Sequence, residues 1–247
     1  MKSRKLFKVC ALLMLAVMSC LLFSGCGGQS EQKKFVITYL PNESTDKNAD
    51  ARKGMAGDLS KVLGMEVTEL VSNDYNAVIE AMRTGKADMA YFGPLSFCLA
   101  YERAGAEPIG MIAKDKDKKN ATYKSVLVTS SKNTDINSIQ DIKGKTMAFV
   151  DPNSTSGNLI PSAAIMKAFP GEKLSMDDLH TNGKFFQAVS FSGKHRAGLA
   201  AVVKGDVQVA PISDAILAAE INAGRVSKDD VKIIFASDPI PSEPMAL

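Results

Sequence analysis

Short apolar runs alternate with amphipathic segments along most of this chain, and this alternation constrains the fold more than any other feature. The runs KFVITYL, MEVTELV and TMAFVD are rich in apolar and β-branched residues and are typical of strands. The segments SNDYNAVIEAMRTG and HRAGLAAVVKG carry apolar residues at helical spacing, and a glycine closes or follows each of them. Strands that alternate with helices predict an α/β fold with a largely parallel sheet.

The alternation is interrupted by the polar loop AKDKDKKNATY and then starts again. Because 247 residues are enough for two such units, we expect two α/β lobes. We place lobe 1 at residues 35–120 and lobe 2 at residues 121–235, with residues 236–247 returning to lobe 1. The sequence stops at PSEPMAL without a closing helix, so we also expect that it is a fragment lacking a C-terminal part of the fold.

The N-terminal residues have the layout of a secretory signal. MKSRKLFK is basic, the next run of about 15 residues is apolar but shorter than the roughly 20 that span a membrane, and SGC follows. The segment resembles a bacterial lipobox, apart from Phe23, where a smaller residue is usual. The resemblance implies a signal peptide at residues 1–25, a lipid on Cys26 and a tether at residues 26–34. A plain secreted protein cut nearby is the alternative.

Removal of residues 1–25 changes the charge and cysteine arguments. Without them, 26 of the 30 basic residues remain against 27 acidic ones, so the net charge falls from +3 to −1. This loss of basic excess argues against a nucleic-acid partner. Cys98 becomes the only free thiol beside the acylated Cys26, which excludes an intrachain disulfide. With only His180 and His195 in the sequence, we expect no metal and no cofactor.

The stretch DPNSTSGNLIP follows the strand TMAFVD and leads into a predicted helix. Three hydroxyl residues, Ser154, Thr155 and Ser156, precede Gly157, which allows a ligand to approach the backbone closely. Ligands of parallel α/β sheets gather at the carboxyl ends of strands, and the first N–H groups of a helix attract anions. This segment therefore predicts an oxyanion cradle. The alternative is that one hydroxyl merely caps the helix.

A second stretch, VSFSGKHRAGLAAVVKG, places His195 near the start of another helix. A histidine at a helix N-terminus tends towards neutrality, and its ring N–H can still donate a hydrogen bond to an oxyanion. By itself His195 is also compatible with a surface position. Beside a hydroxyl cradle in the same lobe, it is a candidate for a second contact with the anion.

Together, DPNSTSGNLIP, SFSGKH, NDYNAVIEAMRTGKADMAYFGPLS and TYKSVLV resemble the substrate-binding proteins of phosphonate-type ABC transporters, a family that also serves phosphate and phosphite uptake. The resemblance covers residues 35–247. It implies a type II periplasmic-binding fold in which two α/β lobes close on a ligand in the cleft between them.

The resemblance also implies roles for individual residues. Ser154, Thr155 and His195 match the phosphoryl-binding groups of the family, while Tyr75 and Tyr123 match aromatic residues that approach the ligand.

Three further positions complete the expected site. Ser125, two residues after Tyr123 on the same strand face, is a further donor. Aminophosphonate binders of the family place acidic groups against the ligand's amine. Glu243 matches one of these positions, and the other falls near Asp214, where the match shifts by one residue.

The sequence therefore predicts a lipid-anchored receptor on the outer face of the cell membrane. It would capture a small phosphorus oxyanion, a phosphonate, phosphite or phosphate, and deliver it to the permease of an ABC importer. One alternative is a receptor for another small oxyanion such as a sulfonate. The other is a secreted phosphoesterase using Ser154 and His195, but no G-x-S-x-G motif or metal-ligand spacing supports catalytic residues.

Overall fold

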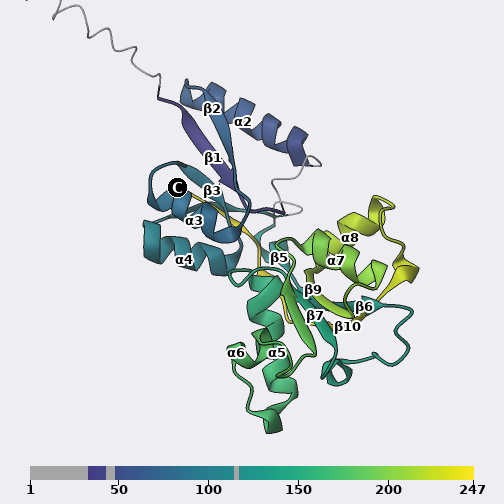
Figure 1. The fold of residues 1–247 in the computed structure, drawn as a ribbon. Coiled ribbons are helices and arrows are strands. Elements are labelled where there is room, and N and C mark those ends of the chain that lie inside the picture. Colours follow the sequence, from purple (N-terminus) through teal and green to yellow (C-terminus); the bar gives the residue numbers. More distant parts are fainter. Residues whose placement is uncertain (1–32, 43–47, 114–116) are drawn as a thin grey trace, which may run out of the picture. The chain divides into compact units, whose positions relative to one another are not determined.

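The computed structural model describes residues 33–42, 48–113 and 117–247, and residues 34–247 form one compact unit (Figure 1). The predicted signal peptide and Cys26 lie outside the described residues. Across the described ranges, none of the helices combines the length and the apolar character that a membrane span requires.

The first sheet has five strands in the order β2-β1-β3-β12-β4. Its strands are β1 (Phe35–Tyr39), β2 (Val67–Val71), β3 (Met89–Tyr91), β4 (Pro108–Met111) and β12 (Pro244–Ala246). The helices that accompany it are α2 (Ala49–Leu63), α3 (Tyr75–Arg83) and α4 (Pro94–Ala104). Side chains alternate across a strand, so α2 packs on the face of Ile37, and α3 and α4 pack on the face of Ala90.

The second sheet also has five strands, in the order β10-β6-β9-β7-β8. Its strands are β6 (Ser125–Ser130), β7 (Thr146–Phe149), β8 (Ala188–Phe191), β9 (Val209–Ser213) and β10 (Val231–Ala236). Its helices are α5 (Ile160–Ala168), α6 (Met176–His180), α7 (His195–Lys204) and α8 (Asp214–Asn222). Short 3-10 turns cover Lys118–Asn120, Ile139–Ile142, Pro170–Glu172 and Lys228–Asp230, and a π-helix covers Thr155–Leu159.

The second sheet is covered by helices on both faces. Leu127 of β6 packs in one apolar cluster with residues of α5 and α6, whereas Val126 and Val128 pack in another with residues of α7 and α8. This arrangement follows from the period of two in a strand, which sends neighbouring side chains to opposite faces. Apolar runs such as SVLVTS therefore form strands that are buried on both sides.

The α/β class predicted from the sequence is confirmed, but the sheets are mixed and not largely parallel. In each sheet two strand pairings are parallel and two are antiparallel. The antiparallel pairings involve β6 and β12, the first strands after the chain passes from one sheet to the other. The two crossing segments pair with each other as β5 (Thr122–Tyr123) and β11 (Ile240–Pro241).

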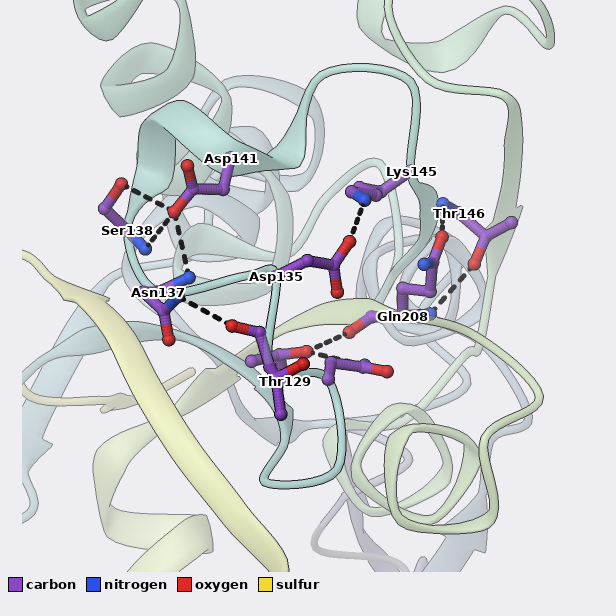
Figure 2. Close-up of polar contacts among 10 residues, drawn as sticks. Thr129, Asp135, Asn137, Ser138, Asp141, Lys145, Thr146 and Gln208 are labelled. Carbon is purple, nitrogen blue, oxygen red and sulfur yellow. Dashed lines mark hydrogen bonds and ion pairs between the residues drawn. The ribbon is translucent and has the colours of Figure 1, made fainter.

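One end of the second sheet is closed by a polar network, shown in Figure 2. Thr129 Oγ1 donates to the Gln208 carbonyl over 2.7 Å, and the backbone and side chain of Gln208 exchange two hydrogen bonds with Thr146, of 2.8 and 3.0 Å. Lys145 pairs with Asp135 beside them. At the opposite end of β6 and β9, Ser125 pairs with Ser213, and Ser213 lines the cavity described in the next section.

Candidate ligand-binding site

A cavity of about 170 Å³ lies near the carboxyl ends of β7 and β9 and is lined by residues from both sheets. Seven of the ten ligand-binding residues expected from the sequence line it: Tyr75, Tyr123, Ser154, Thr155, Ser156, His195 and Glu243. A larger cavity of about 630 Å³ between α5 and the segment 235–241 contains none of the ten. The smaller cavity is therefore the candidate site.

The hydroxyl cradle is formed by a turn after β7 that the sequence did not predict. The chain enters a π-helix before α5 begins, and π-helical turns occur often at functional sites. Ser154 caps this turn, since its Oγ accepts a hydrogen bond from the Gly157 N–H over 3.0 Å. Capping therefore accounts for one hydroxyl of the three, and those of Thr155 and Ser156 have other roles.

Thr155 and Ser156 are both buried and both line the cavity. Thr155 Oγ1 accepts a hydrogen bond of 2.9 Å from the backbone N–H of Leu95, in the first turn of α4. This contact joins the cradle to α4, which packs on the first sheet, while the Thr155 side chain also bonds to Tyr123. Ser156 Oγ lies 3.4 Å from His195 Nε2.

Gly157 lies behind the cradle and does not line the cavity. A Cβ atom at this position would lie 2.4 Å from the Cβ of Val150 and 2.7 Å from Ser154 Oγ, closer than real Cβ contacts come. The glycine is therefore required by the packing of the turn against Val150. The sequence interpretation gave it a different role, close approach of the backbone to a ligand.

His195 begins α7, and only 5% of its surface is exposed. Its Nδ1 accepts a hydrogen bond of 3.2 Å from the backbone N–H of Ser213, which assigns the ring proton to Nε2. Burial lowers the pKa of His195 to about 4; the Pro211 carbonyl opposes this shift and the charge of Arg196 adds to it. The ring is therefore neutral at pH 7, and its Nε2–H is a donor beside the cradle.

Two buried tyrosines face the same cavity. Burial raises the pKa of Tyr75 well above its usual value, against hydrogen bonds from Ser154 and Asn42 that lower it. Burial also raises the pKa of Tyr123, and the negative charge of Glu243 adds to the shift, against hydrogen bonds from Ser156 and Thr155 that lower it. Both phenols therefore stay protonated and can donate to an anion.

Asn42 is a site residue that the sequence analysis missed. It lines the cavity, its Nδ2 donates to the Tyr75 hydroxyl over 2.9 Å, and its Oδ1 accepts from the His195 backbone N–H over 2.8 Å. Arg196 donates to the Asn42 carbonyl over 2.7 Å and pairs with Glu220. Asn42 therefore connects Tyr75 of α3, which packs on the first sheet, to the N-terminus of α7, which packs on the second.

Two other expected residues lie just outside the cavity lining. Ser125 is fully buried, and its Oγ donates to the Ser156 carbonyl over 2.7 Å, so it supports the cradle from behind. The Asp214 carboxylate accepts from the Lys124 N–H over 2.8 Å. Among the described residues, no lysine or arginine lines the cavity, and no cluster of three or more His, Cys, Asp or Glu is placed to hold a metal.

The family model of the periplasmic substrate-binding protein of phosphonate ABC transporters matches residues 37–247. The chain belongs to this family. It is accordingly an extracytoplasmic binding protein and not an enzyme, as the sequence predicted.

Three curated relatives are similar to it. The chain is 28% identical to the phosphate-import protein PhnD of Mycolicibacterium smegmatis over 89% of its own length and 70% of that protein. It is 28% identical to the phosphonates-binding periplasmic protein of Escherichia coli, over 91% of its length and 63% of that protein. With the probable ABC transporter phosphite binding protein PhnD1 of Prochlorococcus marinus it shares 31% identity, over 81% of its length and 63% of that protein.

Solved structures agree on the fold. A binding protein component of an ABC phosphonate transporter from Pseudomonas aeruginosa superposes with a TM-score of 0.74 at 24% identity, over 87% of this chain and 68% of that one. The structure of PhnD1 from Prochlorococcus marinus in complex with methylphosphonate gives a TM-score of 0.71 at 21% identity, over 87% of this chain and 76% of that one. The fold is therefore the type II periplasmic-binding fold predicted from the sequence.

Proposed function

We propose that this protein captures a phosphonate or a related phosphorus oxyanion, phosphite or phosphate, and delivers it to the permease of an ABC importer. The observation that carries the proposal is the convergence of neutral donors on one small cavity. They are the hydroxyls of Thr155 and Ser156, the Nε2–H of His195 and the phenols of Tyr75 and Tyr123.

The physical argument rests on burial and on the ionisation states of these groups. A hydrogen bond to an ionised acceptor is roughly twice as strong as one between neutral groups. Out of water it strengthens further. Because the His195 ring and both phenols are neutral donors at pH 7, they can bind an anion without a lysine or arginine in the cavity. The cavity of about 170 Å³ is well below the roughly 300–1,000 Å³ of clefts for drug-sized ligands, so it fits a small oxyanion.

The names of the relatives support the same ligand class, since they refer to phosphate, phosphonates and phosphite. The choice within this class depends on the group attached to phosphorus. Of the two acidic residues expected to meet an amine, Glu243 lines the cavity and the Asp214 carboxylate is bonded to Lys124. This arrangement supports a contact between Glu243 and a ligand amine, but not a second one from Asp214.

The mode of attachment is a further part of the proposal. The lipobox-like segment supports lipidation of Cys26, which would hold the protein on the outer face of the cell membrane through the tether at residues 26–34. The division into lobes at residues 35–120 and 121–235, with 236–247 returning, is supported by the two separate sheets. In this arrangement the cavity would open and close as one lobe moves against the other.

The test is calorimetric titration of the chain, expressed in full and purified, with methylphosphonate, 2-aminoethylphosphonate, phosphite, phosphate, methanesulfonate and sulfate. We expect micromolar or tighter binding of at least one phosphorus oxyanion and no heat with sulfate. Affinity should change little between low and moderate salt, because no lysine or arginine of the described residues lines the cavity. The absence of binding heat with all four phosphorus oxyanions contradicts the proposal. Binding of methanesulfonate alone would assign the cavity to sulfonates.

A further inference from the structure

Ser213 stands at the end of β9 and immediately before α8, the position that caps a helix. A serine at this position usually accepts a hydrogen bond from the second or third N–H of the helix. Ser213 has the extended backbone of a capping residue, with φ −68° and ψ 131°, but its side chain makes no capping hydrogen bond. Its hydroxyl is therefore not used for the role that its place in the fold suggests.

The Ser213 side chain is also buried, with 3% of the residue exposed, and it lines the candidate cavity. Within the described ranges, its Oγ is one of the few buried side-chain polar atoms without a hydrogen-bond partner in the protein. A buried hydroxyl without a partner costs free energy, and native proteins rarely keep one without a reason. A hydroxyl of this kind on the wall of a ligand cavity is best explained by a ligand contact.

The neighbours of Ser213 place it beside the groups already assigned to the oxyanion. Its backbone N–H donates to His195 Nδ1, and its Cα pairs with that of Ser125, whose hydroxyl donates to the Ser156 carbonyl. Ala215 and Ile216, in the first turn of α8, line the same cavity. Since α8 has nine residues, its N-terminus adds a partial positive charge on this side.

We propose that the Ser213 hydroxyl donates a hydrogen bond to an oxygen of the bound phosphorus oxyanion, beside the contact made by His195. The N-terminus of α8 then supports the negative charge of that oxygen. The inference rests on the proposed function and adds to it a residue that sets ligand affinity. Because the contact is to the oxyanion, it serves every phosphorus oxyanion that the cavity accepts, whatever group is attached to phosphorus.

Ser162 provides a matched control for the experiment. It lies in α5, is fully buried, and its Oγ also has no partner among the described residues, but it does not line the cavity. The variants Ser213→Ala and Ser162→Ala therefore remove the same kind of atom from two places. Each is compared with the wild-type chain by thermal unfolding without ligand and by calorimetric titration with methylphosphonate, phosphite and phosphate.

We expect both variants to unfold at the wild-type temperature or slightly above it, because an unpaired buried hydroxyl is removed. Ser213→Ala should raise the Kd on the order of 10- to 100-fold for each oxyanion that the wild type binds, the range for a hydrogen bond to a charged group. Ser162→Ala should leave the Kd unchanged.

Three outcomes overturn the inference alone. Wild-type affinity in Ser213→Ala would show that the hydroxyl does not contact the ligand. A lower unfolding temperature at unchanged affinity would show that the hydroxyl caps α8. A loss confined to one ligand shows that Ser213 contacts the attached group and not the oxyanion. A wild-type chain that binds none of the oxyanions overturns the proposed function and this inference together, whereas the first three outcomes leave the proposed function intact.

Discussion

The two ends of the second sheet carry similar polar residues and use them differently. At the end shown in Figure 2, Thr129 at the end of β6 and Thr146 at the start of β7 each bond to Gln208, the residue before β9. At the other end, Ser156 lies 3.4 Å from His195, a long contact, and Ser213 keeps its hydroxyl without a partner within the described residues. One end satisfies its polar groups within the protein, and the other holds donors in a cavity.

The difference shows how one sheet can contribute to stability at one end and to ligand binding at the other. Paired buried groups contribute to the free energy of unfolding, whereas unpaired ones reduce it and become favourable only when a ligand pairs with them. We therefore expect substitutions at the Figure 2 end to change stability and not affinity. Substitutions of donors at the cavity end should change affinity more than stability.

The largest effect is expected from Gly157→Ala, which acts at the cavity end. The new Cβ would lie 2.4 Å from the Val150 side chain, so the cradle turn must shift. Overpacking of this kind costs about 1–3 kcal/mol of unfolding free energy. The displaced hydroxyls should lower ligand affinity about 100-fold or more, the effect of moving binding groups by about an ångström. Urea unfolding and calorimetric titration measure the two losses.

Gly171→Ala is the control for this variant. Gly171 lies in the short turn Pro170–Glu172 and does not line the cavity, and a Cβ added to it would meet no heavy atom within 4 Å. It should keep wild-type stability and affinity. Full binding by Gly157→Ala would show that the cradle tolerates the shift and that its geometry does not limit affinity.

The second-largest effect is on the pH dependence of the unfolding free energy, which differs between the two ends of the sheet. Burial lowers the pKa of His195 to about 4, below the ordinary value of 6.5, so the folded state favours the neutral ring. Its contribution to stability is present above pH 6.5 and is lost as the pH falls from 6.5 through about 4, in total on the order of 3 kcal/mol. At the other end, hydrogen bonds lower the pKa of Asp141, and the hydrogen bond with Lys145 lowers that of Asp135. Their contribution is lost only below about pH 3.8.

His195→Asn tests this assignment, because its Oδ1 can still accept from the Ser213 N–H while its side chain cannot titrate. Unfolding free energies measured by urea from pH 7.5 to 4.5 should fall less steeply in the variant than in the wild type. Burial also lowers the pKa of His180, which contributes equally to both proteins. Parallel pH profiles would mean that burial does not lower the pKa of His195 in the folded state.

The third effect is on affinity at the cavity end. His195→Ala removes the Nε2–H donor and leaves an oxyanion oxygen without its partner, which should weaken binding by about 1–3 kcal/mol. Titration at pH 7.5 measures the loss, with His180→Ala as the control, since His180 bonds to Asn158 and does not line the cavity. An unchanged Kd in His195→Ala would remove this residue from the site.

The cavity end could be predicted in part because several of its residues are adjacent in the sequence. Ser154, Thr155 and Ser156 follow a strand directly, and a run of hydroxyls at that place is a local signal. Asn42 has no such signal, since an asparagine in the turn PNES is also an ordinary turn residue. Its role depends on Tyr75 and His195, which are distant in sequence and meet only in the folded chain.

The fold was predictable to the same degree. Alternation of apolar runs with helical segments identified the α/β class, because periodicity is a local property. The antiparallel direction of β6 and β12 depends on where the chain crosses between the sheets. The periodicity of a short segment does not indicate where such a crossing occurs. The π-helix at Thr155–Leu159 was expected as an ordinary helix start, since its sequence is compatible with both. Ser125 and Asp214 were predicted near the ligand; they do not line the cavity, and each bonds to a backbone group, the Ser156 carbonyl and the Lys124 N–H.

The smallest effect is expected at the Figure 2 end. Thr129 Oγ1 donates to the Gln208 carbonyl over 2.7 Å and accepts from Asn133 Nδ2 over 2.9 Å, and the residue is fully buried. Thr129→Val keeps the shape but leaves both partners unpaired, which should lower the unfolding free energy by about 1–2 kcal/mol. The affinity for the oxyanion should not change, because the cavity lies at the other end of β6.

The matched control for this last variant is Thr84→Val. Thr84 also donates through its hydroxyl to a backbone carbonyl, that of Glu80 over 2.7 Å, but it is exposed at the end of α3. Water can replace the lost bond there, so its unfolding free energy should stay close to that of the wild type. A weaker oxyanion affinity in Thr129→Val would show that the two ends of the sheet are coupled. The separation between a paired end for stability and an open end for binding would then not hold.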